Sequence, residues 1–573
     1  MGSDDSRSLR SLSRCSRGRV DRDGGDAGNC GGGSLRAAYH VAYAGVYHGV
    51  GPVLIRAGKS YALLIGVVLL LTVGLVLYSQ VFAFVWDEGY HVLAAQLITR
   101  GKRPYLDFCF PQTPLNAYWN AALLRVFGDR WRVIHAGAAL LTGGAIMLIA
   151  DYVYFRFPVR QWRFAAALTA ALPVAGSVLV VKFATAGQGY GLCLFMILAA
   201  FRLSISAVDS AAVLRAGLAG CFAAAAAASS LLTAPVWLVL ALWLLLYNQA
   251  GSRWMKIAAF VAGSVIPFLP LLYLFSIGPR QVMFDIFNYQ FQYRQVRWPG
   301  AMAHNIGVFA SWIDSSQAFL LLLMSVTSLV FIAYQSGWSQ RLRAEFYLCG
   351  CLALTLAIHI STALPAFERY YLLTVPFLGV LASAGLYSVS TRMYASERPV
   401  LSLAVFALLF SLSLAKRLIE DRDDFRWRDF ERMAAKIDAV TPPDGMLLGD
   451  EHIYFLTRRP PPSGMELADS HKLEFPPATA ALFHLLPQSE LDRRIKAGTY
   501  DTVETCENDE EEVQALDLPR LYSQQMKVEN SACAVFWNKK PVNAQTSFEP
   551  KRTTSSKRSY QRGLPRIGPF PSR

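Results

Sequence analysis

Long apolar runs separated by short polar or charged loops make up most of this chain. The first run, residues 61–85, contains no charged residue and is long enough to cross a lipid bilayer as a helix. Ten similar runs follow, at residues 133–153, 162–181, 188–206, 211–228, 231–248, 256–277, 315–335, 345–363, 370–389 and 399–416. We therefore predict a polytopic α-helical membrane protein, a transmembrane bundle of about eleven spans.

The pattern changes after the last apolar run. Charged and apolar residues alternate at helical spacing over residues 425–440, which predicts an amphipathic helix. Short apolar runs at 445–450 and 532–537 are typical of buried strands. These elements predict a small α/β domain over residues 420–540.

Positively charged residues in the short loops indicate the orientation of the spans. If the N-terminus is inside, the inner loops hold a consistent set of cations, as the positive-inside rule requires: Arg156, Arg160, Arg163, Arg202, Arg215, Arg253, Lys256, Arg341, Arg343, Arg392 and Arg398. An odd number of spans then places the C-terminal domain outside. Three long segments also fall on the outer side, at residues 86–132, at 278–314 and after 417.

Composition adds the ends of the chain to this organisation. Of the 573 residues, 53% are hydrophobic and only 17% are charged, which excludes a soluble protein of this size. The formal net charge is +14, and most of it lies in the two polar ends. We predict disordered basic tails over residues 1–56 and 541–573. Between them lie a membrane domain over 57–419 and the α/β domain over 420–540. Such tails contact anionic lipid, so the predicted partner is the lipid bilayer and not nucleic acid.

The cysteines indicate no metal centre. All nine are scattered, with no CxxC motif and no Cys/His cluster, so we predict no metal site and no cofactor. Cys506 and Cys533 lie in the C-terminal domain and could pair if this domain faces an oxidising compartment.

Two adjacent carboxylates, Asp87 and Glu88, follow the first apolar run directly. A carboxylate pair at the edge of hydrocarbon loses hydration at a high cost, so such groups are more often functional than incidental. The loop that they open also concentrates cations and aromatic residues near the bilayer surface. A carboxylate can take a proton from an acceptor, cations can hold a leaving phosphate, and aromatic rings can pack against a sugar. The combination indicates sugar transfer from a lipid phosphate.

Candidate residues follow from the same three residue types. We predict that Asp87 and Glu88 are catalytic. The candidates for substrate binding lie on the outer loops and at the start of the tenth apolar run: Lys102, Arg103, Asp107, Gln112, Arg294, Arg297, Glu368, Arg369 and Tyr370.

Four short motifs in these loops resemble a known family. They are the pair Asp87-Glu88, the Gly-x-x-Pro-Tyr-x-Asp segment at 101–107, the Pro-Gln-x-Pro-Leu segment at 111–115 and Glu-Arg-Tyr-Tyr-Leu at 368–372. Together they resemble the GT-C glycosyltransferases, above all the protein O-mannosyltransferases, the lipid A aminoarabinose transferases and their bacterial relatives. The resemblance implies that Asp87 is catalytic, that the donor is a polyprenyl-phosphate sugar and that anomeric configuration inverts.

The chain departs from the family pattern at two places. Aminoarabinose transferases carry a phosphate-binding lysine near the proline segment, where this chain has Gln112 or Thr113. Many relatives also carry a second aspartate in the outer loop after the third span, where residues 182–188 contain no carboxylate. The run Asp450-Glu451-His452 suggests metal ligands, but the resemblance implies no metal there.

The sequence thus predicts a glycosyltransferase of a bacterial inner membrane. It would move a sugar from undecaprenyl phosphate to an extracytoplasmic acceptor, which could be a glycolipid, lipopolysaccharide or a protein. The main alternative is a polytopic transporter or flippase for lipids or glycolipids, which would need polar residues deep in several spans and often internal repeats. A ligase or polymerase of another fold and a non-enzymatic membrane scaffold are also compatible with the membrane pattern.

Overall fold

The computed structural model describes residues 58–82, 85–292, 301–363, 365–393, 399–420, 426–468, 470, 473–505, 516–527 and 533–539. The predicted tails, together with Arg294 and Arg297, lie outside the described residues. Every helix, strand, contact and cavity given for the protein lies within these ranges.

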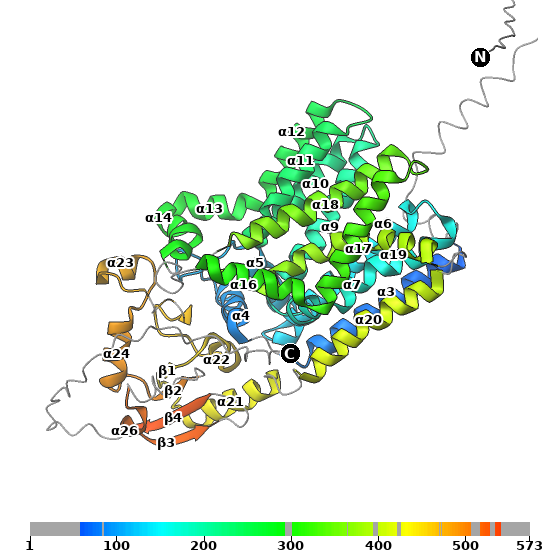
Figure 1. Cartoon of the computed structure of the whole chain (residues 1–573). Helices are drawn as coiled ribbons and strands as arrows, with labels where there is room; N and C mark the ends of the chain where they lie inside the picture. The colour runs from blue at the N-terminus through cyan, green and yellow to red at the C-terminus, as the bar shows by residue number, and fades with distance from the viewer. Residues whose placement is uncertain are drawn as a thin grey trace, which may run out of the picture. The chain divides into compact units, whose positions relative to one another are not determined.

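Helices form at all eleven predicted apolar runs. Eight of the described helical segments are long and apolar enough to cross a membrane. They are α3 (Lys59–Ser79), α6 (Trp131–Arg156), α9 (Tyr190–Val208), α12 to α13 (Arg253–Ile277), α17 (Ser316–Tyr334), α18 (Gln340–Ser361), η5 with α19 (Glu368–Met393) and α20 (Pro399–Glu420). Two shorter apolar segments are α10 (Val213–Ser229) and η2 with α11 (Leu231–Leu246). The length and apolar composition of these helices confirm the prediction of a polytopic helical membrane protein. Figure 1 shows how the helices pack together.

The predicted run 162–181 forms two helices instead of one span. They are α7 (Arg163–Gly176) and α8 (Val178–Phe183), and Ser177 between them has extended backbone. Pro173 lies in the last turn of α7, and its ring removes one backbone donor from the helix. After this break the chain changes direction. The segment that follows α8 contains Gln188, which lies at the candidate site.

Two glycines allow α10 and α12 (Arg253–Val265) to pack with their backbones in close approach. A Cβ added at Gly220 would lie only 1.9 Å from the carbonyl oxygen of Phe260. A Cβ added at Gly263 would lie 2.0 Å from the carbonyl oxygen of Gly217. Small residues serve this purpose in membrane helices, where close van der Waals contact drives association.

The C-terminal part is an α/β domain, as predicted. Its helices are α21 (Trp427–Val440), α22 (Glu451–Thr457), α23 (Pro477–Leu482), α24 (Gln488–Lys496) and α26 (Leu518–Leu521). Its strands are β1 (Leu447–Leu448), β2 (Thr502–Thr505), β3 (Tyr522–Lys527) and β4 (Ala534–Lys539). The sheet order is β1-β2-β4-β3, with β1 parallel to β2 and the other pairs antiparallel. Figure 1 shows β3 and β4 beside α26.

Cys533, just before β4, is disulfide-bonded. The described cysteines Cys109, Cys193, Cys221, Cys349 and Cys351 are free, so the partner of Cys533 is none of these. Cys506, the predicted partner, lies outside the described residues.

The segment predicted to be the first outer loop connects the helical bundle to this domain. It contains α4 (Val85–Thr99) and α5 (Leu115–Phe127), and α4 packs against α22. Leu93 on α4 and Ile453 on α22 belong to one apolar cluster. The amide of Gln96 donates to the carbonyl oxygen of Phe455 at 3.1 Å. The contact fixes the helix that carries the two candidate carboxylates.

The second outer loop begins with α14 (Pro279–Met283), followed by η4 (Phe284–Asn288), and resumes with α16 (Ala301–Asp314). Asp285 on η4 joins this loop to the first, because its carboxylate accepts from the backbone N–H of Phe110 at 2.9 Å. The two outer loops therefore meet around a common space.

Candidate active site

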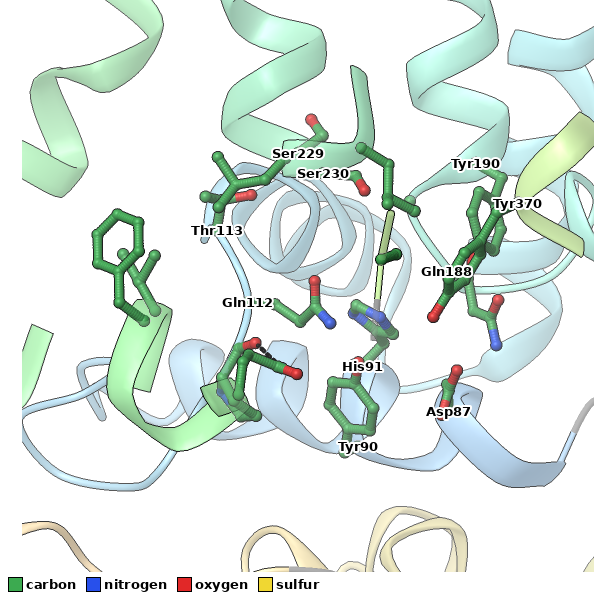
Figure 2. Close-up of a pocket in the computed structure, with 18 of the residues that line it drawn as sticks. Asp87, Tyr90, His91, Gln112, Thr113, Gln188, Tyr190, Ser229, Ser230 and Tyr370 are labelled. Atoms are coloured by element: carbon green, nitrogen blue, oxygen red, sulfur yellow. Dashed lines mark hydrogen bonds between the residues drawn. The ribbon is translucent and has the colours of Figure 1, made fainter. Parts of the chain in front are cut away.

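A cavity of about 620 Å³ lies where the two predicted outer loops meet the ends of the spans. Its wall combines the start of α4, the segment before α5, the segment before α9, the junction between α10 and α11, and η4. Figure 2 shows Asp87, Gln188, Tyr190 and Tyr370 on one side of the cavity, and Ser229 and Ser230 on another. The cavity holds carboxylate, amide, hydroxyl, imidazole and aromatic groups, which suits a polar substrate with a ring face.

Asp87, at the cavity wall, meets Arg369, which lies 282 positions later in the sequence and is not itself a lining residue. The carboxylate of Asp87 lines the cavity and forms an ion pair with the guanidinium of Arg369. The Asp87 side chain is 38% exposed and that of Arg369 is 13% exposed. The guanidinium carbon of Arg369 lies 4.2 Å from the ring centre of Phe367 and 5.5 Å from that of Tyr370. Asp87 is thus oriented by a packed cation yet remains accessible from the cavity.

Glu88 points to a different environment from that of its neighbour. Its carboxylate is buried, pairs with the imidazole of His135 on α6, and accepts from the backbone N–H of Gly187 at 2.7 Å. The other ring nitrogen of His135 lies 2.5 Å from the carbonyl oxygen of Ser79 at the end of α3. Glu88 therefore links α4 to two spans and to the segment that carries Gln188.

Gln188 is a cavity residue that the sequence did not single out. It is 3% exposed and lines the cavity, and neither its amide nitrogen nor its amide oxygen has a hydrogen-bond partner among the described residues. Its neighbour Gly187 is held by the side-chain amides of Asn116 and Asn120, at 3.3 and 2.8 Å from its carbonyl oxygen. An unsatisfied buried amide costs about 1–3 kcal/mol, which a bound substrate could recover. The only sequence signal was its place in the segment 182–188, a region where many relatives carry an aspartate.

His91 and Gln112 form the middle of the cavity wall, as Figure 2 shows. The rings of Tyr90 and His91 stack at a centroid distance of 4.4 Å, and Nδ1 of His91 lies 3.4 Å from the amide of Asn116. Burial lowers the pKa of His91 to about 4, although the charge of Glu88 opposes this shift. The imidazole is therefore neutral at pH 7 and can donate a hydrogen bond to a substrate or accept one from it.

The described cavity wall does not include the other candidates from the first loop. Arg103 and Asp107 form a salt bridge at 3.0 Å, and the hydrogen bonds from Arg103 lower the pKa of Asp107. Lys102 is exposed. Glu368 accepts from the hydroxyl of Ser311 on α16 at 2.5 Å. Roles for these residues in substrate binding stay predictions, as do those of Arg294 and Arg297 outside the described residues.

Asp285 is buried between the two outer loops and has an altered acidity. Loss of hydration raises its pKa to about 8 from an ordinary value near 3.8, against the lowering effect of the bonds from Phe110 and the Cys109 thiol. A raised carboxyl pKa means that the folded protein binds this proton more tightly than the unfolded chain does. The stability that Asp285 contributes is therefore complete below about pH 4 and is lost as pH rises through about 8.

Replacing Asp285 with asparagine should flatten the pH dependence of stability. The wild-type melting temperature in detergent is expected to fall between pH 6 and pH 9, and the fall should be smaller in Asp285→Asn because the amide does not ionise. Exposed Asp314 on α16 provides the matched control, Asp314→Asn. Equal slopes in the wild type and Asp285→Asn would show that Asp285 ionises normally.

Comparison with known proteins shows the fold. The crystal structure of ArnT from Cupriavidus metallidurans bound to undecaprenyl phosphate matches with a TM-score of 0.60 at 16% identity, over 84% of this chain and 98% of that one. The apo state of the same protein matches with a TM-score of 0.56 at 16% identity, over 83% and 97% of the two chains. The chain therefore has the fold of ArnT, in agreement with the resemblance that the sequence motifs indicated.

Sequence comparison adds nothing to this result. No protein-family model matches the chain, and no curated protein sequence matches it either.

Proposed function

We propose that this chain, which has the GT-C fold, transfers a sugar from a polyprenyl phosphate to an acceptor at the outer membrane surface. The structural neighbour bound to undecaprenyl phosphate supports this class of donor, and its match extends over nearly its whole length. The observation that carries the proposal is the accessible carboxylate of Asp87, which is held by Arg369 and lies at the wall of a cavity with both polar and apolar lining residues.

In the proposed reaction, a hydroxyl or amine of the acceptor attacks the anomeric carbon of the donor sugar. Asp87 receives the proton of the attacking group as the new bond forms. The bond between the anomeric carbon and the phosphate oxygen breaks on the opposite face, so the configuration inverts and polyprenyl phosphate leaves. Arg369 can hold Asp87 and a phosphate oxygen together, because a guanidinium presents five N–H donors.

Glu88 has a positioning role in this proposal. It holds Gly187 and His135, so it sets the distance between the start of α4 and the segment with Gln188. The side-chain amide of Gln188 then binds a polar group of the sugar or of the acceptor. Lys102 and Arg103 lie outside the described cavity wall. In this proposal they would contact the anionic headgroups of membrane lipids.

Removing the Gln188 amide should weaken transfer without weakening the fold. We expect Gln188→Ala to lower kcat/KM by roughly tenfold to a hundredfold, since one buried hydrogen-bonding group is lost. The melting temperature of the ligand-free protein should not fall, because this amide has no partner in the described structure. The control is Gln335→Ala. Gln335 directly follows the C-terminal end of α17 and does not line the cavity. A lower melting temperature with unchanged kinetics would indicate a structural role for Gln188.

We infer that the C-terminal domain lies on the extracytoplasmic side of the membrane. The arrangement of cations in the short loops supports this orientation, and so does the disulfide at Cys533, because disulfides persist in oxidising compartments. A reporter fused near residue 480 tests it directly. Alkaline phosphatase should be active at this point and a cytoplasmic fluorescent reporter should not, and the reverse result would overturn the orientation.

The activity itself is tested by comparing cells with and without this protein. Mass spectrometry of membrane glycolipids, surface glycans and envelope proteins should find one class that loses a sugar when the protein is absent. The lipid-linked donor of the same sugar should accumulate. If glycan masses stay the same and only the distribution of a lipid between leaflets changes, the chain is a transporter or flippase and the proposal is wrong.

A further inference from the structure

Three side chains with metal-ligating atoms meet in the C-terminal domain, far from one another in the sequence. Asp450 precedes α22, His452 lies in its first turn, and Glu504 lies on β2. One ligand atom from each side chain lies within 4.8 Å of the other two. His452 and Glu504 are each only 3% exposed, whereas Asp450 is partly exposed and leaves an entry path.

The imidazole of His452 gives a second, independent indication of a ligand. Its Nε2 is buried and has no hydrogen-bond partner among the described residues. The ring is fixed against Phe430 of α21 at a centroid distance of 4.3 Å, so it cannot easily turn towards water. A buried ring nitrogen without a partner is costly, and the same ring offers a ligand atom within 4.8 Å of the two carboxylates. A cation that accepts electron pairs from all three side chains would offset that cost.

We propose that Asp450, His452 and Glu504 bind a divalent transition-metal ion of the Zn²⁺ class. One imidazole nitrogen with two carboxylate oxygens suits Zn²⁺ better than Ca²⁺, which prefers oxygen ligands alone. In a tetrahedral site, ligand atoms about 2.0–2.2 Å from Zn²⁺ lie about 3.3–3.6 Å from one another. The ligand atoms of the three side chains, now within 4.8 Å of one another, therefore need to close by up to about 1.5 Å when the ion binds. Water can complete the coordination on the side of Asp450.

The ion would lie close to the first turn of α4, the helix that carries Asp87. A Cβ added at Gly89 on α4 would lie 3.3 Å from Cβ of Glu451 and from the backbone nitrogen of His452. The start of α22 thus packs directly against the start of α4. By joining β2 to α22, the ion would hold this contact in place, which gives it a structural role and not a role in the transfer step.

Metal content and thermal stability of the full chain test this site. Protein in nanodiscs, stripped with chelator and dialysed, is titrated with Zn²⁺, Mn²⁺ or Ca²⁺, and bound metal is measured by mass spectrometry. We expect about one Zn²⁺ per chain, a melting temperature that rises by several degrees, and weak or no binding of Ca²⁺. Glu504→Gln should weaken Zn²⁺ binding tenfold or more. Asp501→Asn, which changes a carboxylate next to β2 that pairs with Lys539, should retain it.

Asp450→Asn provides a second test if Glu504→Gln fails to fold, because Asp450 is partly exposed and its replacement leaves the buried groups in place. It should also lose Zn²⁺ while keeping the wild-type circular dichroism spectrum. The proposal is overturned if the wild type binds no Zn²⁺, or if Asp450→Asn binds as much as the wild type. Absence of metal with a higher melting temperature in Glu504→Gln would instead identify a proton shared between the carboxylates.

Discussion

Replacement of Asp87 by asparagine is expected to slow sugar transfer by about 10²- to 10⁴-fold, the contribution of a general base. The amide keeps the size and the cavity position of the side chain but cannot take a proton from the acceptor. The ion pair with Arg369 is also lost. Initial rates, measured in membranes with equal amounts of inserted protein, give the effect.

Asp129→Asn is the matched control for this variant. Asp129 lies in the same outer loop, partly exposed, and contacts the Gln96 amide at 3.4 Å away from the cavity wall. Its replacement should leave the rate within about threefold of wild type, since the side-chain oxygen of asparagine can still accept from the Gln96 amide. An Asp87→Asn protein that is correctly inserted and fully active would exclude Asp87 as the base.

Removal of the Arg369 guanidinium is the second large effect that we expect. Arg369→Gln should lower kcat by about 10²- to 10³-fold, the loss seen when one donor to a developing negative charge is removed. Arg369→Lys should restore only part of the rate, because an ammonium lacks the planar fork that can hold Asp87 and a phosphate oxygen together. The kinetics are measured with donor and acceptor varied separately.

Two comparisons distinguish a phosphate contact at Arg369 from one elsewhere in the protein. Arg103→Gln changes another cation predicted to bind substrate, which is exposed and paired with Asp107, and should have a small effect. The double variant Asp87→Asn with Arg369→Gln should be only slightly slower than the slower single variant, since groups that act as a unit are not additive. Fully additive losses, or a larger effect at Arg103 than at Arg369, would assign the phosphate contact elsewhere.

The sequence predicted the helical elements well, because apolar runs of span length leave few other structures possible in a bilayer. It did not predict the break at Ser177, where Pro173 weakens the end of α7 inside an apolar run that continues to residue 181. Hydropathy averages over such a break, since the residues on both sides are equally apolar. The α/β domain was predictable because its strands follow turns and differ in pattern from the spans.

The candidate site was predictable only in part. Asp87 could be named from its place at the end of the first apolar run, but its contact with Arg369 bridges 282 residues and follows from the packing of the spans. Adjacent side chains on a helix point about 100° apart, so Asp87 and Glu88 necessarily face different surroundings. The sequence could not decide which of them faces the cavity. Gln188 was not predicted because relatives place a carboxylate in this segment, and an amide there carries no comparable signal.

The cluster in the C-terminal domain illustrates the same limit. Asp450 and His452 are visible as a short run, and the resemblance argued against a metal there. The third member, Glu504, comes from β2, which is paired parallel to β1 just before Asp450. Sequence spacing does not reveal that pairing, so the grouping emerges only from the sheet.

Release of free polyprenyl phosphate by the purified protein tests the central assignment most directly. Wild-type protein and Asp87→Asn are reconstituted with the lipid extract and the envelope fraction of cells that lack the protein, and both lipids and acceptors are followed by mass spectrometry. The wild type should consume a polyprenyl-phosphate sugar, release polyprenyl phosphate and add the same sugar mass to one acceptor, whereas Asp87→Asn should not. Sugar gained by an acceptor without consumption of any lipid-linked donor, or equal turnover by both proteins, would contradict this assignment.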